Sequence, residues 1–333
     1  MLISEVSTAD FKGGELFYKF DTTFHQPRAI IKIQVVIPEL RDSLENAVFL
    51  DLMVSCLAQQ MVEDTYPADL AQLEHSVSAA ERGIIISLSG LNDKLHLLLE
   101  TILGHFKAFE KNFDGQLYEA VRDQTKKNYY NAFIKPEKVV KELRLFMMQD
   151  VFRYFRRVCI LPLSKLNHYR CAQDKHKIVS KISGDQVKSF KKSIFDKPMF
   201  VQVLVQGNMD SNEAKSIFNS VIQTFPINKD KKIDIESSEI IVKKIPETGT
   251  KFLRVDGFNP KDSNTLITNY YQFGPGRIMD EIHLEVACQL MEEPVFDTLR
   301  TKEQLGYTVY SMMRNTHGIL GVSVTVNTQV PAY

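Results

Sequence analysis

The sequence has no excess charge, no long apolar run and no paired cysteine motif, and each absence disfavours a class of protein. Lysine plus arginine number 41, as do aspartate plus glutamate, so the net charge is zero. That balance gives no support for a nucleic-acid partner or a polybasic membrane contact. No apolar run approaches the roughly 18 residues of a membrane-spanning helix. The first residues lack the basic segment and apolar core of a secretory signal.

The cysteines indicate a reducing environment. None of the four lies in a C-x-x-C pair, and two fall within apolar stretches that are predicted to be helical; they are Cys56, Cys159, Cys171 and Cys288. Free, buried thiols are the simplest interpretation of this pattern. We therefore expect no disulfide framework and a cytoplasmic location.

Motifs for common hydrolytic chemistry are missing as well. Neither H-E-x-x-H nor H-x-x-E-H occurs, and neither does G-x-S-x-G. His283 and Glu285 are two residues apart in a predicted helix, so they do not share a face and cannot grip one ion. The segment Gly274–Arg277 reads GPGR but lacks the lysine and the spacing of a phosphate-binding loop. We expect no metal site and no catalytic residue within this chain.

What is present indicates an α+β protein with a large core. The chain has 333 residues, of which 44% are hydrophobic, enough for two domains. In residues 29–38, Ile31, Ile33 and Val35 alternate with Lys32 and Gln34, which predicts a strand with one wet face. Further strands are predicted at 16–20, 83–90 and 200–208, and helices at 44–63, 66–76, 93–110, 117–134, 136–155 and 211–225.

The pattern of strands and helices starts again after a polar segment. Cys56 and Cys288 are 232 residues apart, and the same offset places Gln72-Leu73 on Gln304-Leu305. Strands are predicted at 239–245, 252–258, 264–274, 307–313 and 319–327, and a helix at 278–303. We predict two homologous domains, each a largely antiparallel sheet with helices, at residues 1–228 and 239–333, joined by a linker at 229–238. The second lacks the helices that cover the first, so we expect a fragment or one piece of a larger assembly.

Arg300 and Tyr307 are the candidate functional residues. They stand where a helix ends and a strand begins, and the first repeat has Ala68 and His75 at the matching positions. The fold therefore does not require this pair. A guanidinium is a rigid donor fork and a phenol donates one hydrogen bond, a combination that suits an anion or a peptide carbonyl. The alternative interpretation is that Arg300 is an ordinary surface arginine and Tyr307 an ordinary tyrosine of the sheet, with no shared function.

The segments around these residues resemble a known enzyme family. EEPVFDTLRTKEQLGYTVY and RNTHGILGVSVTVNTQ, together with YPADLAQLEHSV, NAFIKPEKVVKELRL and VLVQGNM, resemble the third domain and the start of the fourth in the insulinase/pitrilysin family of zinc metallopeptidases. Within the family, the chain is most similar to the member that selects paired basic residues. The resemblance covers nearly the whole chain.

The resemblance implies how such a chain works. Four homologous domains form two halves around a chamber, the zinc ion is bound in the first domain, outside this chain, and Arg300 and Tyr307 bind substrate. We expect a non-catalytic chamber-wall portion of a zinc endopeptidase that cleaves on the N-terminal side of basic residues. Its partners would be a peptide substrate and a zinc-bearing half, in the same or another polypeptide. There are two alternatives: the chain is an inactive peptide-binding or partner-binding module, or it is a product that does not fold alone.

Overall fold

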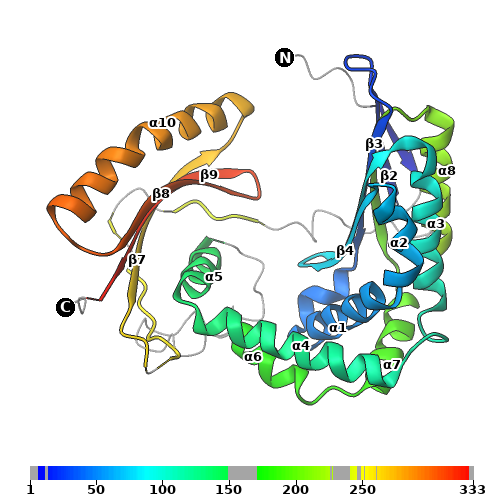
Figure 1. The fold of residues 1–333 in the computed structure, drawn as a ribbon, viewed down its shortest axis with the longest axis horizontal. Coiled ribbons are helices and arrows are strands. Elements are labelled where there is room, and N and C mark those ends of the chain that lie inside the picture. Colours follow the sequence, from blue (N-terminus) through cyan, green and yellow to red (C-terminus); the bar gives the residue numbers. More distant parts are fainter. Residues whose placement is uncertain are drawn as a thin grey trace. The chain divides into compact units, whose positions relative to one another are not determined.

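The structure is a computed structural model that describes residues 7–11, 14–148, 171–225, 227, 241–245, 249–250, 252–259 and 261–329 (Figure 1). The chain divides into two compact units, one of Met1–Lys126 with Lys175–Glu239 and the other of Lys127–Asp174 with Ile240–Tyr333. The predicted linker at 229–238 lies outside the described residues, and the domain limits of 1–228 and 239–333 stay predictions. Within the described ranges, no helix is both long and apolar enough to cross a membrane.

A six-stranded sheet forms the centre of the first unit. Its strand order is β1-β2-β6-β3-β5-β4, and β2 runs parallel to β6 while the other neighbours are antiparallel. The strands are β1 (Ser7–Phe11), β2 (Gly14–Phe20), β3 (Arg28–Val36), β4 (Glu74–Ala80), β5 (Gly83–Leu91) and β6 (Phe200–Gly207). The predicted alternation in β3 is confirmed, because Ile31, Ile33 and Val35 are fully buried and Lys32 is exposed.

Helices α1, α3 and α8 pack against this sheet. The helices that begin in the unit are α1 (Leu44–Gln60), α2 (Val62–Leu70), α3 (Asn92–Ala108), α4 (Gly115–Ile134), α7 (Gly184–Phe195) and α8 (Ser211–Thr224); α6 (Cys171–Val179) crosses its boundary, and a short 3₁₀ helix, η1 (Pro38–Asp42), precedes α1. Ser43 caps α1 and Asp210 caps α8 through side-chain oxygens that accept backbone N–H groups of the first turn.

The second unit contains a three-stranded antiparallel sheet of order β7-β9-β8. Its elements are α5 (Pro136–Met148), β7 (Thr265–Pro275), α10 (Ile278–Phe296), the π-helical turn η4 (Asp297–Lys302), β8 (Thr308–Thr316) and β9 (Ile319–Thr328). Asn315 of β8 donates to Glu281 of α10, whereas Thr316, one residue further, accepts from Arg144 of α5. Because successive strand residues point to opposite faces, α10 and α5 lie on opposite faces of this sheet.

The structure departs from three of the predicted elements. The helix expected at 66–76 ends at Leu70, and Glu74 already belongs to β4, since Gln72 has a positive φ of 57° that no helix accommodates. The segment 252–258 forms no strand, and Phe252 at its start is 81% exposed. Residues 241–245, the described part of the strand expected at 239–245, contain only an isolated bridge residue.

Candidate functional site

The structure brings Arg300 and Tyr307 together. The guanidinium carbon of Arg300 lies 4.8 Å from the centroid of the Tyr307 ring and 4.8 Å from that of Phe296. A cation over an aromatic face is attracted to the ring, by about 0.5–1 kcal/mol at an exposed site. The two rings therefore restrict the orientation of the guanidinium, and among the described residues its N–H groups have no hydrogen-bond acceptor.

The backbone between the two residues adopts a rare conformation. Residues Asp297–Lys302 form a π-helical turn directly after α10, and the Leu305 N–H donates to the Leu299 carbonyl at 2.9 Å. Gln304 has φ of 54°, a left-handed conformation that is uncommon for a non-glycine residue. Such turns and such residues are frequent at functional sites. They bring the chain from helix to strand over few residues, which places Tyr307 beside Arg300.

Gly306 makes the turn possible at its strand end. A Cβ atom at this position would lie 2.1 Å from the carbonyl oxygen of Asn327 in β9. Only glycine lets the chain approach β9 this closely before β8 begins. Because Tyr307 is the next residue, its place depends on this contact.

The pair remains accessible to a ligand. Tyr307 is 83% exposed, and Arg300 is half-buried. Nζ of Lys302 lies 2.7 Å from Oδ2 of Asp297, so the two side chains form an ion pair. The hydrogen bond within this pair raises the pKa of Lys302. Among the described residues, no carboxylate pairs with Arg300. The site therefore offers an uncompensated guanidinium and a phenol hydroxyl to a carbonyl or carboxylate group.

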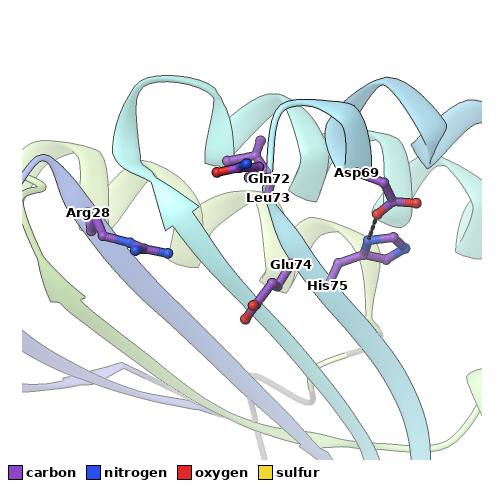
Figure 2. Close-up of a pocket in the computed structure, with 6 residues that line it drawn as sticks. All are labelled: Arg28, Asp69, Gln72, Leu73, Glu74 and His75. Atoms are coloured by element: carbon purple, nitrogen blue, oxygen red, sulfur yellow. Dashed lines mark ion pairs between the residues drawn. The ribbon is translucent and has the colours of Figure 1, made fainter.

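The first repeat contains the same joint without the pair. Gln72, the counterpart of Gln304, also has positive φ, 57° against 54°. At the position of Tyr307 the repeat has His75, whose Nδ1 lies 3.4 Å from Oδ1 of Asp69. His75 and Asp69, together with Glu74 and Arg28, line an open cavity of about 550 Å³, and Figure 2 shows the His75 and Asp69 side chains pointing toward one another. The two joints therefore share this positive φ but carry different side chains at the positions of Arg300 and Tyr307.

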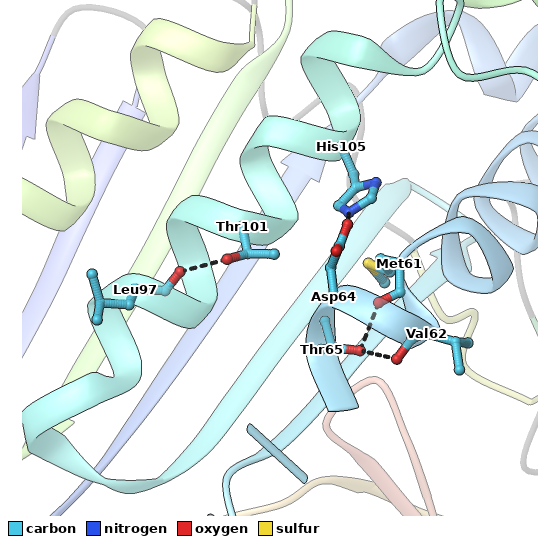
Figure 3. Close-up of polar contacts among 7 residues, drawn as sticks. All are labelled: Met61, Val62, Asp64, Thr65, Leu97, Thr101 and His105. Carbon is cyan, nitrogen blue, oxygen red and sulfur yellow. Dashed lines mark hydrogen bonds and ion pairs between the residues drawn. The ribbon is translucent and has the colours of Figure 1, made fainter. Parts of the chain in front are cut away.

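Helix α2, which leads into this first joint, is anchored to its neighbour. Nε2 of His105 on α3 lies 2.9 Å from Oδ2 of Asp64 (Figure 3). The buried hydroxyl of Thr65 donates to the carbonyl of Met61 at 2.8 Å, one turn earlier in the chain. The Asp64–His105 contact holds the first turn of α2 against α3.

The described residues do not fit a zinc site or a thiol nucleophile. No group of three or more His, Cys, Asp or Glu side chains among them is arranged to hold a metal ion. Cys56 and Cys288 are free and buried. Burial raises the pKa of Cys56 to about 12 and also raises that of Cys288, which keeps both thiols protonated and unreactive.

Phe296 and Gly306 are the residues of the site that the sequence analysis missed. Phe296 precedes Arg300 by four residues, the spacing at which helical side chains are neighbours, so the signal for the second ring was present. Gly306 stands between Leu305 and Tyr307, but nothing local indicates that β9 passes so close.

Two profiles of one peptidase family cover most of the chain. Residues 6–155 match the "middle or third domain of peptidase M16" and residues 181–332 the "peptidase M16 inactive domain". Human nardilysin is 35% identical over 323 residues, which are 96% of this chain and 26% of that protein. A peroxisomal insulin-degrading enzyme-like protein of Arabidopsis thaliana is 28% identical over 95% of this chain and 31% of its own length. The chain thus spans about a quarter to a third of these relatives.

The fold agrees with solved structures of the same kind. The crystal structure of pitrilysin matches 97% of this chain with a TM-score of 0.67 at 15% identity, over 32% of that chain. A peptidase M16 inactive domain from Pseudomonas fluorescens matches 98% of this chain with a TM-score of 0.57 at 13% identity, over 74% of that chain. The expected likeness to the C-terminal, non-zinc part of an insulinase-family enzyme is confirmed, and the chain belongs to the M16 peptidase family, from which it carries the middle-type and the inactive-type domain.

Proposed function

We propose that this chain is the substrate-binding, chamber-wall portion of a nardilysin-like zinc endopeptidase, and that Arg300 and Tyr307 grip the peptide backbone. The observation that carries the proposal is the Arg300 guanidinium, which contacts the rings of Phe296 and Tyr307, with its carbon 4.8 Å from each ring centroid. Held this way, it donates hydrogen bonds to a carbonyl oxygen without first losing conformational freedom.

The zinc ion belongs to another part of the complete protein. A related protein of Schizosaccharomyces pombe is named a putative zinc protease, which supports zinc chemistry in the parent enzyme. The residues of this chain bind and orient, and the hydrolytic step takes place at a zinc-bearing half in the same or another polypeptide. Cleavage on the N-terminal side of basic residues and a cytoplasmic location are further parts of the proposal.

A binding assay on the chain tests the proposal directly. The probe is a fluorescein-labelled eight-residue peptide with a central Arg-Arg pair, followed by fluorescence anisotropy. Arg300→Gln removes the charged donor, and we expect the peptide Kd to rise about tenfold or more. Arg254→Gln is the matched control, because Arg254 is an exposed arginine in the same unit. Equal Kd values for wild type and Arg300→Gln would refute the role of this residue.

A non-enzymatic partner-binding module is the second candidate. Large apolar side chains on α10 are exposed among the described residues; they are Ile278, Met279, Ile282, Val286 and Leu290. Exposed apolar surface of this kind marks an interaction site. Proteolysis by the chain together with a zinc-bearing half favours the first candidate, and a stable complex without proteolysis favours the second.

A further inference from the structure

Two arginines meet on the face of the second sheet opposite α10. Arg144 comes from α5, and its Nη1 donates to the hydroxyl of Thr316 at 3.0 Å. Arg314 comes from β8, and its Nε donates to the hydroxyl of Ser323 at 2.9 Å. Ser323 is fully buried and Thr316 nearly so. Each guanidinium is thus oriented by a neutral hydroxyl, which leaves its charge uncompensated.

Tyr270 of β7 completes the cluster. The guanidinium carbon of Arg144 lies 5.2 Å from the centroid of its ring. Its phenol oxygen is buried beside the Arg144 guanidinium, which interacts with it as a donor, and within the described part of the chain no acceptor takes its O–H. Burial raises the pKa of this phenol, while Arg144 and Arg314 both act in the opposite direction. Both cations therefore lie near one phenol that still has its donor to give.

The strand between β7 and β8 makes room for this phenol. Gly321 of β9 is paired with Arg314, and a Cβ atom at Gly321 would lie 2.5 Å from the Tyr270 oxygen. A side chain at this position would push the ring away from the two cations. The cluster is therefore assembled by the packing of three strands and one helix, and is not a chance meeting of surface side chains.

The charges in this cluster are one-sided. Burial lowers the pKa of Arg144, and the proximity of Arg314 lowers it further. No acidic side chain of the described residues forms an ion pair with either arginine. Two partly desolvated like charges destabilise each other unless a counter-charge is bound. Guanidinium groups match the geometry of carboxylate and phosphate oxygens, which they bind in a bidentate manner.

We propose that Arg144, Arg314 and Tyr270 form a binding site for one small oxyanion, a carboxylate or a phosphate group. The two guanidinium groups supply charge and donors, and the Tyr270 hydroxyl supplies a further hydrogen bond. Arg144 and Arg314 are half-buried, so each retains some surface through which an anion is reached. The site is separate from Arg300 and Tyr307, because Tyr307 lies one residue before β8 and Arg314 is near its other end.

Titration of the intact chain with anions, followed by NMR signals of its arginine side chains, tests the site. The protein is labelled with ¹⁵N at arginine, and the Nε–Hε signals of Arg144 and Arg314 are assigned from the peaks lost in Arg144→Gln and Arg314→Gln. Inorganic phosphate and acetate are then added separately at constant ionic strength. We expect both signals to shift with one saturating curve, and the anion with the lower Kd identifies phosphate or carboxylate as the natural group.

The variants separate a built site from general attraction. Arg314→Gln should weaken the response of Arg144 at least about tenfold, and Tyr270→Phe, which keeps the ring and removes the hydroxyl, should weaken both responses severalfold. The control Arg254→Gln should leave both curves unchanged. Linear, non-saturating shifts that match those of Arg254 would overturn the proposal. Wild-type affinity for the anion in both single variants, Tyr270→Phe and Arg314→Gln, would also overturn the proposal. Tyr270→Phe is a conservative change, so the test holds even if an arginine variant fails to fold.

Discussion

Arg300 and Tyr307 are separated by six residues and one π-helical turn, and the guanidinium carbon of the first lies 4.8 Å from the ring centroid of the second. The first repeat has the same positive-φ glutamine before its strand but no such contact. The two joints thus share one backbone feature, and only the second carries the pair that we propose binds a ligand. This difference is the reason to assign the pair a function and not a structural role.

Tyr307→Phe separates binding from rate enhancement. In an enzyme that includes the zinc-bearing half, we expect kcat to fall by about 10²-fold with a smaller rise in KM, as for loss of one donor to a developing oxyanion. Steady-state kinetics on the paired-arginine peptide measures both values. Tyr271→Phe is the matched control, because Tyr271 is also highly exposed and lies on a strand of the same sheet. A kcat equal to that of wild type would limit Tyr307 to ground-state binding.

Gly306→Ala should destabilise the second unit and displace the pair. The new methyl group would lie 2.1 Å from the Asn327 carbonyl oxygen, and overpacking of this kind reduces the free energy of unfolding by about 1–3 kcal/mol. Urea unfolding measures the change, and peptide affinity should fall with it. Gly257→Ala is the control, since no atom lies within 4 Å of its added Cβ. Identical unfolding curves for the two variants would show that β8 and β9 yield without strain.

Much of the first unit could be predicted from residue patterns. Strand β3 and the buried helix α1 follow directly from their apolar spacing, and Asp210 and Ser43 are recognisable caps. These features depend on local sequence, where periodicity and capping are informative. The failures at 71–75 and 252–258 have a different origin. A positive φ at Gln72 and the exposure of Phe252 are consequences of tertiary structure.

The candidate site was predictable in its members but not in its geometry. The repeat comparison singled out Arg300 and Tyr307, because a residue that only one copy carries is not needed for folding. That both the Tyr307 and the Phe296 ring contact the cation depends on the π-helical turn and on Gly306. The Arg144–Arg314 cluster joins residues from a helix and a strand far apart in sequence, and no local pattern predicts it.

The stability of the first unit should decline at alkaline pH because of Cys56. Burial raises the pKa of this thiol from 9.0 to about 12, so above pH 9 the unfolded chain releases a proton that the folded chain retains. Stability is therefore unaffected below pH 9 and falls between pH 9 and 12, by about 1.4 kcal/mol per pH unit.

Urea unfolding at pH 8 and pH 10 measures how much the titration of Cys56 changes the free energy of unfolding. Wild type should lose about 1 kcal/mol more than Cys56→Ala over that interval, because the variant has no thiol to titrate. Other groups titrate in both proteins and cancel in the difference. Parallel losses in the two proteins would mean that the thiol ionises in the folded state with its ordinary pKa.

Asp210→Ala should weaken α8. The carboxylate accepts hydrogen bonds from the backbone of Asn212 at 2.7 Å and of Glu213 at 2.8 Å, and Glu213 bonds back to the Asp210 N–H at 2.6 Å. Loss of such a cap reduces the free energy of unfolding by about 0.5–2 kcal/mol. Chemical denaturation measures the change, with Asp123→Ala, an exposed acid within a helix, as the control. An equal effect of both variants would argue against capping as the cause.

A double-mutant cycle on peptide affinity tests the central claim most directly. The Kd of the paired-arginine peptide is measured for wild type, Arg300→Gln, Tyr307→Phe and the double variant. The two side chains touch and would hold the same ligand group. We therefore predict that the double variant loses less binding free energy than the sum of the losses in the two single variants, with a coupling energy of about 0.5–3 kcal/mol. Strictly additive losses, or no loss in either single variant, would contradict the account of these residues as one clamp.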